Sequence, residues 1–146
     1  MVYRLTMTLV SEGQEGNLGT DWKYRIEAKV FCSGLLSDVT VEVPTHTLES
    51  GSVISPHGAP EPVLLFEGEC ENELLLRLRL IATEVDLFIN DEGRVNKDIR
   101  LELPAAGEEA SVQEIDLAAG VRESPGIRDR NAVFTLRIRL ILENVA

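Results

Sequence analysis

Acidic side chains gather directly after a long leucine-rich segment, where Glu84, Asp86 and Asp91 follow one another closely. Carboxylate oxygens are the hard ligands that Ca²⁺ takes, about six to eight at a time. The alternative is structural: Glu84 and Asp86 are the outward residues of a strand, and residues 90–93 form its hairpin turn. The segment leaves a calcium site and an ordinary turn both open.

Basic residues lie two or four positions apart in three segments, which places them on one face of each predicted strand. They are Arg77 and Arg79, Arg137 and Arg139, and Lys23, Arg25 and Lys29. If these strands are neighbours, the residues form a stripe that binds an anionic headgroup or an acidic partner. The alternative is cross-strand pairing with Glu27, Glu42 and Glu102, each pair worth tenths of a kcal/mol to about 1 kcal/mol.

Residues for nucleophilic catalysis or zinc binding are few. His46 and His57, the only two histidines, lie in a segment rich in Pro and Gly, where we expect them on the surface. Cys32 and Cys70 have no metal-binding spacing, and we expect buried or idle free thiols. Nucleophile elbows and phosphate-binding glycine loops are missing from the sequence. The sequence therefore predicts a non-enzymatic protein.

Length and composition predict one folded domain covering residues 1–146. The chain is 44% hydrophobic and 27% charged, close to an ordinary globular protein. Its net charge of −11 repels a polyanion, so nucleic acid is not an expected partner. Residues 1–5 enter a strand pattern without a basic and apolar leader, and no apolar run could span a bilayer. We expect a soluble, cytoplasmic protein.

The dominant pattern is alternation with a period of two, which is typical of half-buried strands. It predicts strands over residues 3–9, 22–30, 39–43, 63–66, 74–80, 85–89, 99–103, 112–117 and 134–142. Turn-forming residues separate these runs, with Pro44 ending the third, and the long connections are 11–21, 44–62 and 118–131. We therefore predict an all-β fold: an antiparallel two-sheet β-sandwich of about eight strands, with Leu78, Leu136 and Ile138 in its core.

Four segments, in their order along the chain, resemble parts of a C2 domain, an eight-stranded sandwich. An aspartate precedes an aromatic-led strand, a central strand runs into an acidic loop, and two further strands follow, at residues 19–26, 76–93, 99–104 and 134–142. The resemblance implies loops at one end that bind Ca²⁺ and phospholipid. It also implies that Asp21, Glu84, Asp86 and Asp91 stand where the Ca²⁺ ligands would.

Two classes of function stay open at this point. The first is a C2-like binding module that docks on a partner protein or an anionic membrane surface, with Ca²⁺ optional. The second is a structural or assembly subunit whose strand edges and loops meet a larger complex or copies of itself in a homo-oligomer.

Overall fold

The computed structural model describes residues 1–56, 61–87, 89–123 and 130–145. Strands dominate these residues: β1 (Val2–Gly16), β2 (Asp21–Cys32), β3 (Leu35–Thr47), β4 (Val53–Ile54), β5 (Val63–Glu69), β6 (Glu73–Glu84), β7 (Asp91–Glu102), β8 (Ser111–Arg122) and β9 (Asn131–Asn144). No helix long and apolar enough to cross a membrane occurs in this described part.

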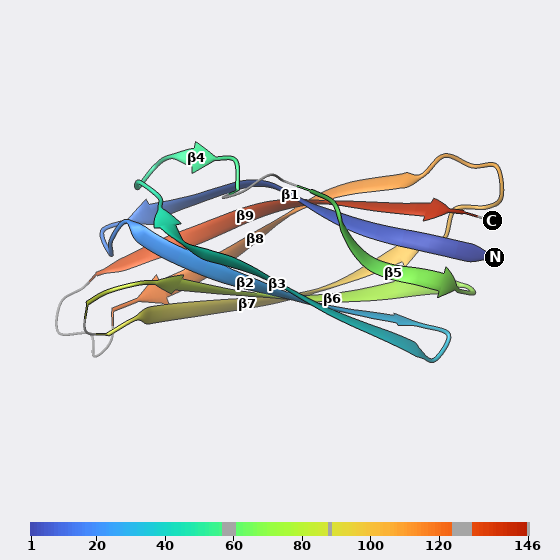
Figure 1. Cartoon of the computed structure of the whole chain (residues 1–146), viewed down its shortest axis with the longest axis horizontal. Helices are drawn as coiled ribbons and strands as arrows, with labels where there is room; N and C mark the ends of the chain where they lie inside the picture. The colour runs from blue at the N-terminus through green and yellow to red at the C-terminus, as the bar shows by residue number, and fades with distance from the viewer. Residues whose placement is uncertain (57–60, 88, 124–129, 146) are drawn as a thin grey trace.

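The strands form two antiparallel sheets that pack face to face (Figure 1). The first sheet has the order β4-β1-β9-β8, with β5 also pairing with β1, and the second has the order β3-β2-β6-β7. The predicted antiparallel two-sheet sandwich is therefore confirmed.

Alternating residues of both sheets fill the space between them. Leu78, Leu136 and Ile138 are fully buried, as predicted, in the same cluster as Leu5, Met7, Trp22, Ile26, Leu76, Leu80 and Phe134. The opposite residues of each strand point to solvent, which is why the sequence shows a period of two.

A bulge in β1 reverses which residues face the core. The pairing of β1 with β9 shifts between Leu9 and Ser11. Leu9 faces the core before the shift, and Glu12 and Gln14 face it afterwards. The strand runs on to Gly16, so the predicted connection 11–21 is wrong over most of its length, because the extra residue of a bulge lets pairing continue in the other phase.

Further predicted boundaries are wrong, among them the start of the connection 118–131, because β8 runs on to Arg122. Pro44 does not end β3, which runs to Thr47 through an irregularity in its pairing with β2. Since β3 lies at the edge of its sheet, a residue without an N–H is tolerated there. The segment predicted as a strand over 85–89 instead connects β6 to β7, as far as its described residues show, and the expected turn residues Asp91 to Gly93 belong to β7.

Cys32 and Cys70 are buried as expected, but they are joined in a disulfide rather than free. Cys32 ends β2, and Cys70 lies between β5 and β6, with 5.6 Å between the Cα atoms. The bond fixes the end of the central strand β2 to the chain that crosses from the first sheet to the second.

Candidate functional site

The four acidic residues proposed as calcium ligands lie at one end of the second sheet. Asp21 begins β2, Glu84 ends β6 and Asp91 begins β7, while Asp86 follows in the connection. Glu84 pairs with Trp22 on one side and with Asp91 on the other. The amide of Val85 donates a 2.7 Å hydrogen bond to the carbonyl oxygen of Asp21. The four residues together are called the acidic end below.

Glu84 is the most perturbed carboxyl of the acidic end. It is 5% exposed, and its Oε2 atom is buried without a hydrogen-bond partner among the described residues. Burial, and then the charges of Asp86, Asp91 and Asp21, raise the pKa of Glu84 to about 7, while Arg130 acts in the opposite direction. A carboxyl in this environment holds a proton close to neutral pH.

Gly19 makes the burial of Glu84 possible. A Cβ atom at this position would overlap Oε1 of Glu84, so a side chain there would push the carboxylate aside. The connection that carries Gly19 is held from the other side by Arg130, whose Nη2 donates to the carbonyl oxygen of Leu18 at 2.5 Å. The β1–β2 connection thereby closes over the carboxylate.

The carboxylate of Asp86 is partly engaged by its own loop. Its Oδ1 accepts a 2.6 Å hydrogen bond from the amide of Leu87, and Oδ1 of Asn90 accepts a 3.0 Å bond from the amide of Asp86. Within the described ranges, no three His, Cys, Asp or Glu side chains are arranged to hold a metal ion. Ca²⁺ binding at the acidic end stays a prediction.

The predicted arginines do not form one stripe. Arg77 and Arg79 lie on β6 of the second sheet, whereas Arg137 and Arg139 lie on β9 of the first. Because each pair points outward from its own sheet, the two pairs face opposite sides of the sandwich. The condition on which the stripe depended, that these strands are neighbours, is not met.

The arginines of the first sheet are paired with acids of β8. Arg137 donates to both carboxylate oxygens of Asp116, at 2.9 and 3.3 Å, and Arg139 donates to Glu114 at 2.6 Å. The hydrogen bond from Arg137 lowers the pKa of Asp116. Both pairs are half exposed, so they contribute little to stability and leave few donors for a ligand.

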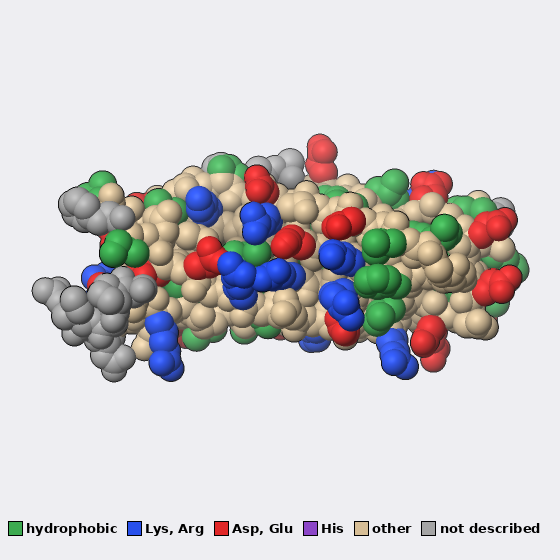
Figure 2. All heavy atoms as spheres, turned by 90° about the horizontal axis from the view of Figure 1, so that it is seen from below, with side chains coloured by type: hydrophobic (Ala, Val, Ile, Leu, Met, Phe, Trp, Pro, Cys, Tyr) green, Lys and Arg blue, Asp and Glu red, His purple; other side chains and the backbone are tan. Residues whose placement is uncertain are grey.

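The second sheet carries a separate cluster of basic residues on its outward side. The register places Lys29 opposite Arg77 and Glu27 opposite Arg79. We call this surface the basic face; its cations are Lys23, Arg25, Lys29, Arg77 and Arg79. Figure 2 shows basic side chains near the middle of this side of the molecule.

A hollow of about 420 Å³ lies within the basic face, between β2, β6 and β7. Arg77 is paired there with Asp98 across 3.1 Å. Arg79 has a buried Nε atom that finds no hydrogen-bond partner in the described part of the chain. The remaining lining residues are Glu27, Lys29 and Asn96. The hollow is therefore lined by a guanidinium whose Nε is covered and lacks a hydrogen-bond partner among the described residues.

Three apolar residues border the basic face in one row across β3, β2 and β6. Phe31 pairs with Leu36 on one side and with Leu75 on the other. Leu36 is 60% exposed, and the other two are partly exposed. The guanidinium carbon of Arg77 lies 5.4 Å from the centre of the Phe31 ring. This apolar row was missed in the sequence, although Phe31 continues the outward phase of Lys29 and Leu75 that of Arg77.

His46 is not on the surface as predicted, because its side chain is only 6% exposed. Nδ1 lies 2.8 Å from the carbonyl oxygen of Pro44, and Nε2 lies 2.6 Å from Oε1 of the buried Glu12. Nδ1 is placed to donate to this carbonyl oxygen, which can only accept, and the contact with Glu12 is an ion pair when the imidazole is protonated. Burial and the Glu12 carboxylate raise the pKa of Tyr24 beside them. The group links β1 of the first sheet to β2 and β3 of the second. His57 lies outside the described residues.

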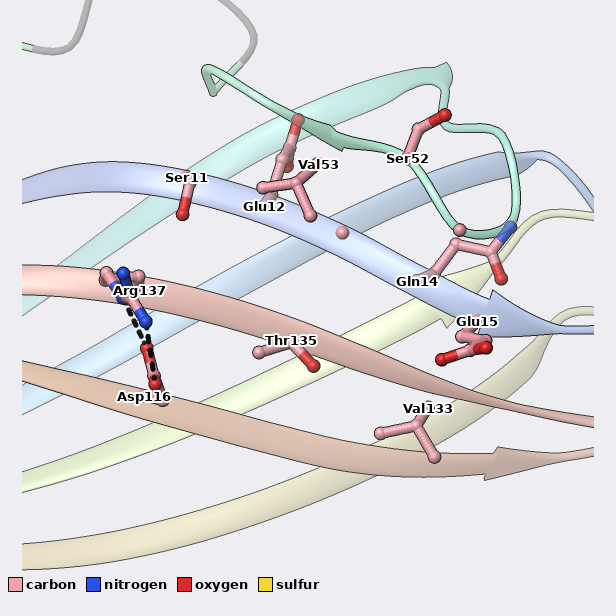
Figure 3. A pocket seen from close by; sticks show the side chains of 12 residues that line it. Ser11, Glu12, Gln14, Glu15, Ser52, Val53, Asp116, Val133, Thr135 and Arg137 are labelled. Carbon is pink, nitrogen blue, oxygen red and sulfur yellow. Dashed lines mark hydrogen bonds and ion pairs between the residues drawn. The ribbon is translucent and has the colours of Figure 1, made fainter.

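A further hollow, of about 410 Å³, separates β4 from the outward side of the first sheet (Figure 3). Thr135 and Val133 lie along it on β9, and the Asp116–Arg137 pair stands at one end. A Cβ atom at Gly13 would come within 2.9 Å of the Ser52 carbonyl oxygen, so glycine lets β4 lie close to β1. The Asp116 and Arg137 side chains bind each other, as Arg77 and Asp98 do in the hollow of the basic face.

Comparison of the sequence with protein-family models and with curated proteins finds no match for this chain.

Proposed function

We propose that this chain is a non-enzymatic binding module that docks on an acidic partner protein through its basic face. The observation that carries the proposal is the cluster of cations on β2 and β6, next to exposed apolar side chains, on a chain whose net charge is −11. Cations gathered on one side of an acidic protein orient an acidic partner toward that side.

The apolar row supports a protein partner in particular. Protein interfaces have an apolar centre with aromatic residues and arginine enriched, surrounded by a polar rim. Phe31, Leu36 and Arg77 provide these residue types side by side. Hydrogen-bonded arginines in such a setting add specificity as well as affinity.

An anionic membrane, the other partner expected from the sequence, is less well supported. Glu27 and Asp98 stand among the cations of the basic face, so its charge is patterned rather than uniformly positive. A patterned surface suits a partner with fixed charges of its own better than a fluid layer of headgroups.

The test is an NMR titration of the isotope-labelled chain with poly-L-glutamate and, separately, with phosphatidylserine vesicles. We expect poly-L-glutamate to shift backbone signals of β2 and β6, and the affinity to fall as salt is added. The double variant Arg77→Glu/Arg79→Glu should weaken binding at least about tenfold. Its matched control is Arg137→Glu/Arg139→Glu on the opposite side, which should bind as the wild type does.

Shifts confined to the first sheet, or equal losses in both double variants, would contradict docking through the basic face. Binding to the vesicles alone would replace the protein partner by a membrane surface.

A further inference from the structure

We propose that the basic face and the apolar row together recognise one kind of acidic segment: an extended chain with an apolar anchor residue and a carboxylate two positions away from it. The inference rests on the proposed function, because it names the chemistry of the partner that docks on this surface.

A hollow of about 430 Å³ at the hairpin between β2 and β3 provides the place for the anchor. Its walls include Phe31, Leu75 and two leucines of β3, Leu35 and Leu36, which are 51% and 60% exposed. Figure 2 shows hydrophobic side chains next to basic ones on this side of the molecule. An apolar side chain that enters the hollow would cover apolar area that water now contacts.

Two cations lie beside the hollow, one step along the same two strands. Phe31 pairs with Leu75, and the next outward residues of β2 and β6, Lys29 and Arg77, pair with each other. Outward residues of a strand are two positions apart, at a rise of about 3.3 Å per residue, so the cations lie about 7 Å along the strands from the apolar pair. Residues i and i+2 of an extended partner segment have the same spacing and point to the same side. They can therefore reach the hollow and the cations together.

Both cations have groups left to bind a carboxylate. Lys29 is exposed, and no ion pair joins it to another described residue. Asp98 accepts a 3.1 Å hydrogen bond from Nε of Arg77, and further N–H groups of the guanidinium remain. The register sets Asp38 beside Lys29 and Asp98 beside Arg77, so the two cations lie between two acids. A carboxylate is therefore attracted most strongly to one position, between Lys29 and Arg77.

The opposite end of the hollow carries an acid. Glu73 lines the hollow there, its side chain is 55% exposed, and its nearest cation, Arg100, is 3.9 Å away. A second carboxylate on that side of the anchor would face Glu73. The segment therefore carries its acid on one side of the anchor only.

The experiment is a fluorescence-anisotropy titration of labelled peptides with the chain. Each peptide has one leucine and one glutamate in a background of glycine and serine, one, two, three or four positions apart and in both orders. We expect a separation of two to bind at least about tenfold more tightly than the other three, because it brings both side chains to one side at the spacing of the two rows. Replacing the glutamate by glutamine should remove this preference.

Variants of the chain test the anchor separately from the charge. Leu36→Ser should bind the peptide with a separation of two at least about tenfold more weakly, and should bind poly-L-glutamate as the wild type does. Leu64→Ser, at a leucine of the first sheet that is 50% exposed, is the matched control and should leave both affinities unchanged.

Equal binding at all four separations, or a Leu36→Ser variant that binds the peptide as well as the wild type, would overturn the anchored segment. If poly-L-glutamate still binds through β2 and β6 in that case, the proposed function stands without it. A preference for three or four positions would overturn the extended segment in favour of a helix, whose neighbouring side chains have these separations. Failure of the peptides and of poly-L-glutamate alike would refute both proposals.

Discussion

At the scale of single residues, Glu84 couples the acidic end to pH. Its pKa is raised from 4.5 to about 7 in the folded chain, so between these values the folded state holds a proton that the unfolded state has released. The unfolding free energy must then fall as the pH rises through this range. Below about pH 4.5 both states are protonated at this residue, and the difference disappears.

Glu84→Gln should therefore be more stable than the wild type at pH 8, by roughly 1–3 kcal/mol, and about equal to it at pH 4.5. Urea unfolding followed by circular dichroism at both pH values measures the difference. Glu102→Gln, at an exposed position of β7, serves as the control and should change stability equally at both pH values. If Glu84→Gln and the wild type lose stability in parallel between these pH values, Glu84 is not the residue that titrates.

Sequence alone did not predict which of the acids would be buried. The register of β6 with β7 places Glu84 opposite Asp91 at one end of a sheet. Burial of Glu84 depends on Gly19, which lies in the connection between β1 and β2. Burial of Glu12 depends on the bulge between Leu9 and Ser11 in the same strand. Neither has a local signal in the sequence, because both result from packing between distant segments.

At the scale of the strands, the disulfide between Cys32 and Cys70 is the strongest constraint that could not be predicted from the sequence. It joins residues 38 positions apart, at the end of β2 and in the connection between β5 and β6. Cysteine spacing gave no reason to pair the two thiols, since their proximity follows from how the chain passes between sheets. Structural disulfides persist most readily in an oxidising compartment, and the cytoplasmic location stays a prediction.

Reduction should lower the stability of the folded chain by about 3–4 kcal/mol, the loop-closure entropy for a loop of 38 residues. For a domain of this size, the melting temperature should drop by roughly 10 °C. Calorimetry with and without a phosphine reductant measures this change. The double variant Cys32→Ser/Cys70→Ser should melt at the lower temperature in both conditions. An unchanged midpoint for the reduced wild type would show that the bond adds no stability.

Strand positions were predictable, and strand ends were less so. Alternation located most strands because one face of each sheet packs on the core. Both β1 and β3 continue past the residues expected to end them, through irregularities that keep the backbone paired while the alternation is broken. Such irregularities remove the periodic signal at the point where a prediction needs it.

At the scale of the whole molecule, the net charge of −11 lowers the stability of the folded chain, because its negative charges repel one another. Added salt screens this repulsion at any site, so a divalent cation stabilises the chain without needing a pocket. A specific Ca²⁺ site would differ. At a free Ca²⁺ concentration of about 100 times the dissociation constant, binding adds about 2.7 kcal/mol to the free energy of unfolding, beyond the effect of screening.

We expect the melting temperature to rise equally with CaCl₂ and MgCl₂ at the same ionic strength, since the acidic end shows no converging ligand set in its described residues. Thermal melts in EDTA, in each salt and in NaCl make the comparison. A further rise of several degrees with Ca²⁺ alone, lost in Asp86→Asn, would contradict this expectation and assign the ion to the acidic end.

The position of β9 beside β1 has a consequence for synthesis on the ribosome. β1 lies between β9 and the short strands β4 and β5, so its longest pairing waits for the strand that is translated last. At ordinary elongation rates this wait lasts on the order of 10 s. All four strands of the second sheet leave the ribosome earlier, and two of its pairings, β2 with β3 and β6 with β7, join consecutive strands. During that interval the first sheet lacks the strand that joins β1 to β8, so the inner apolar side of the second sheet is incompletely covered until β9 arrives.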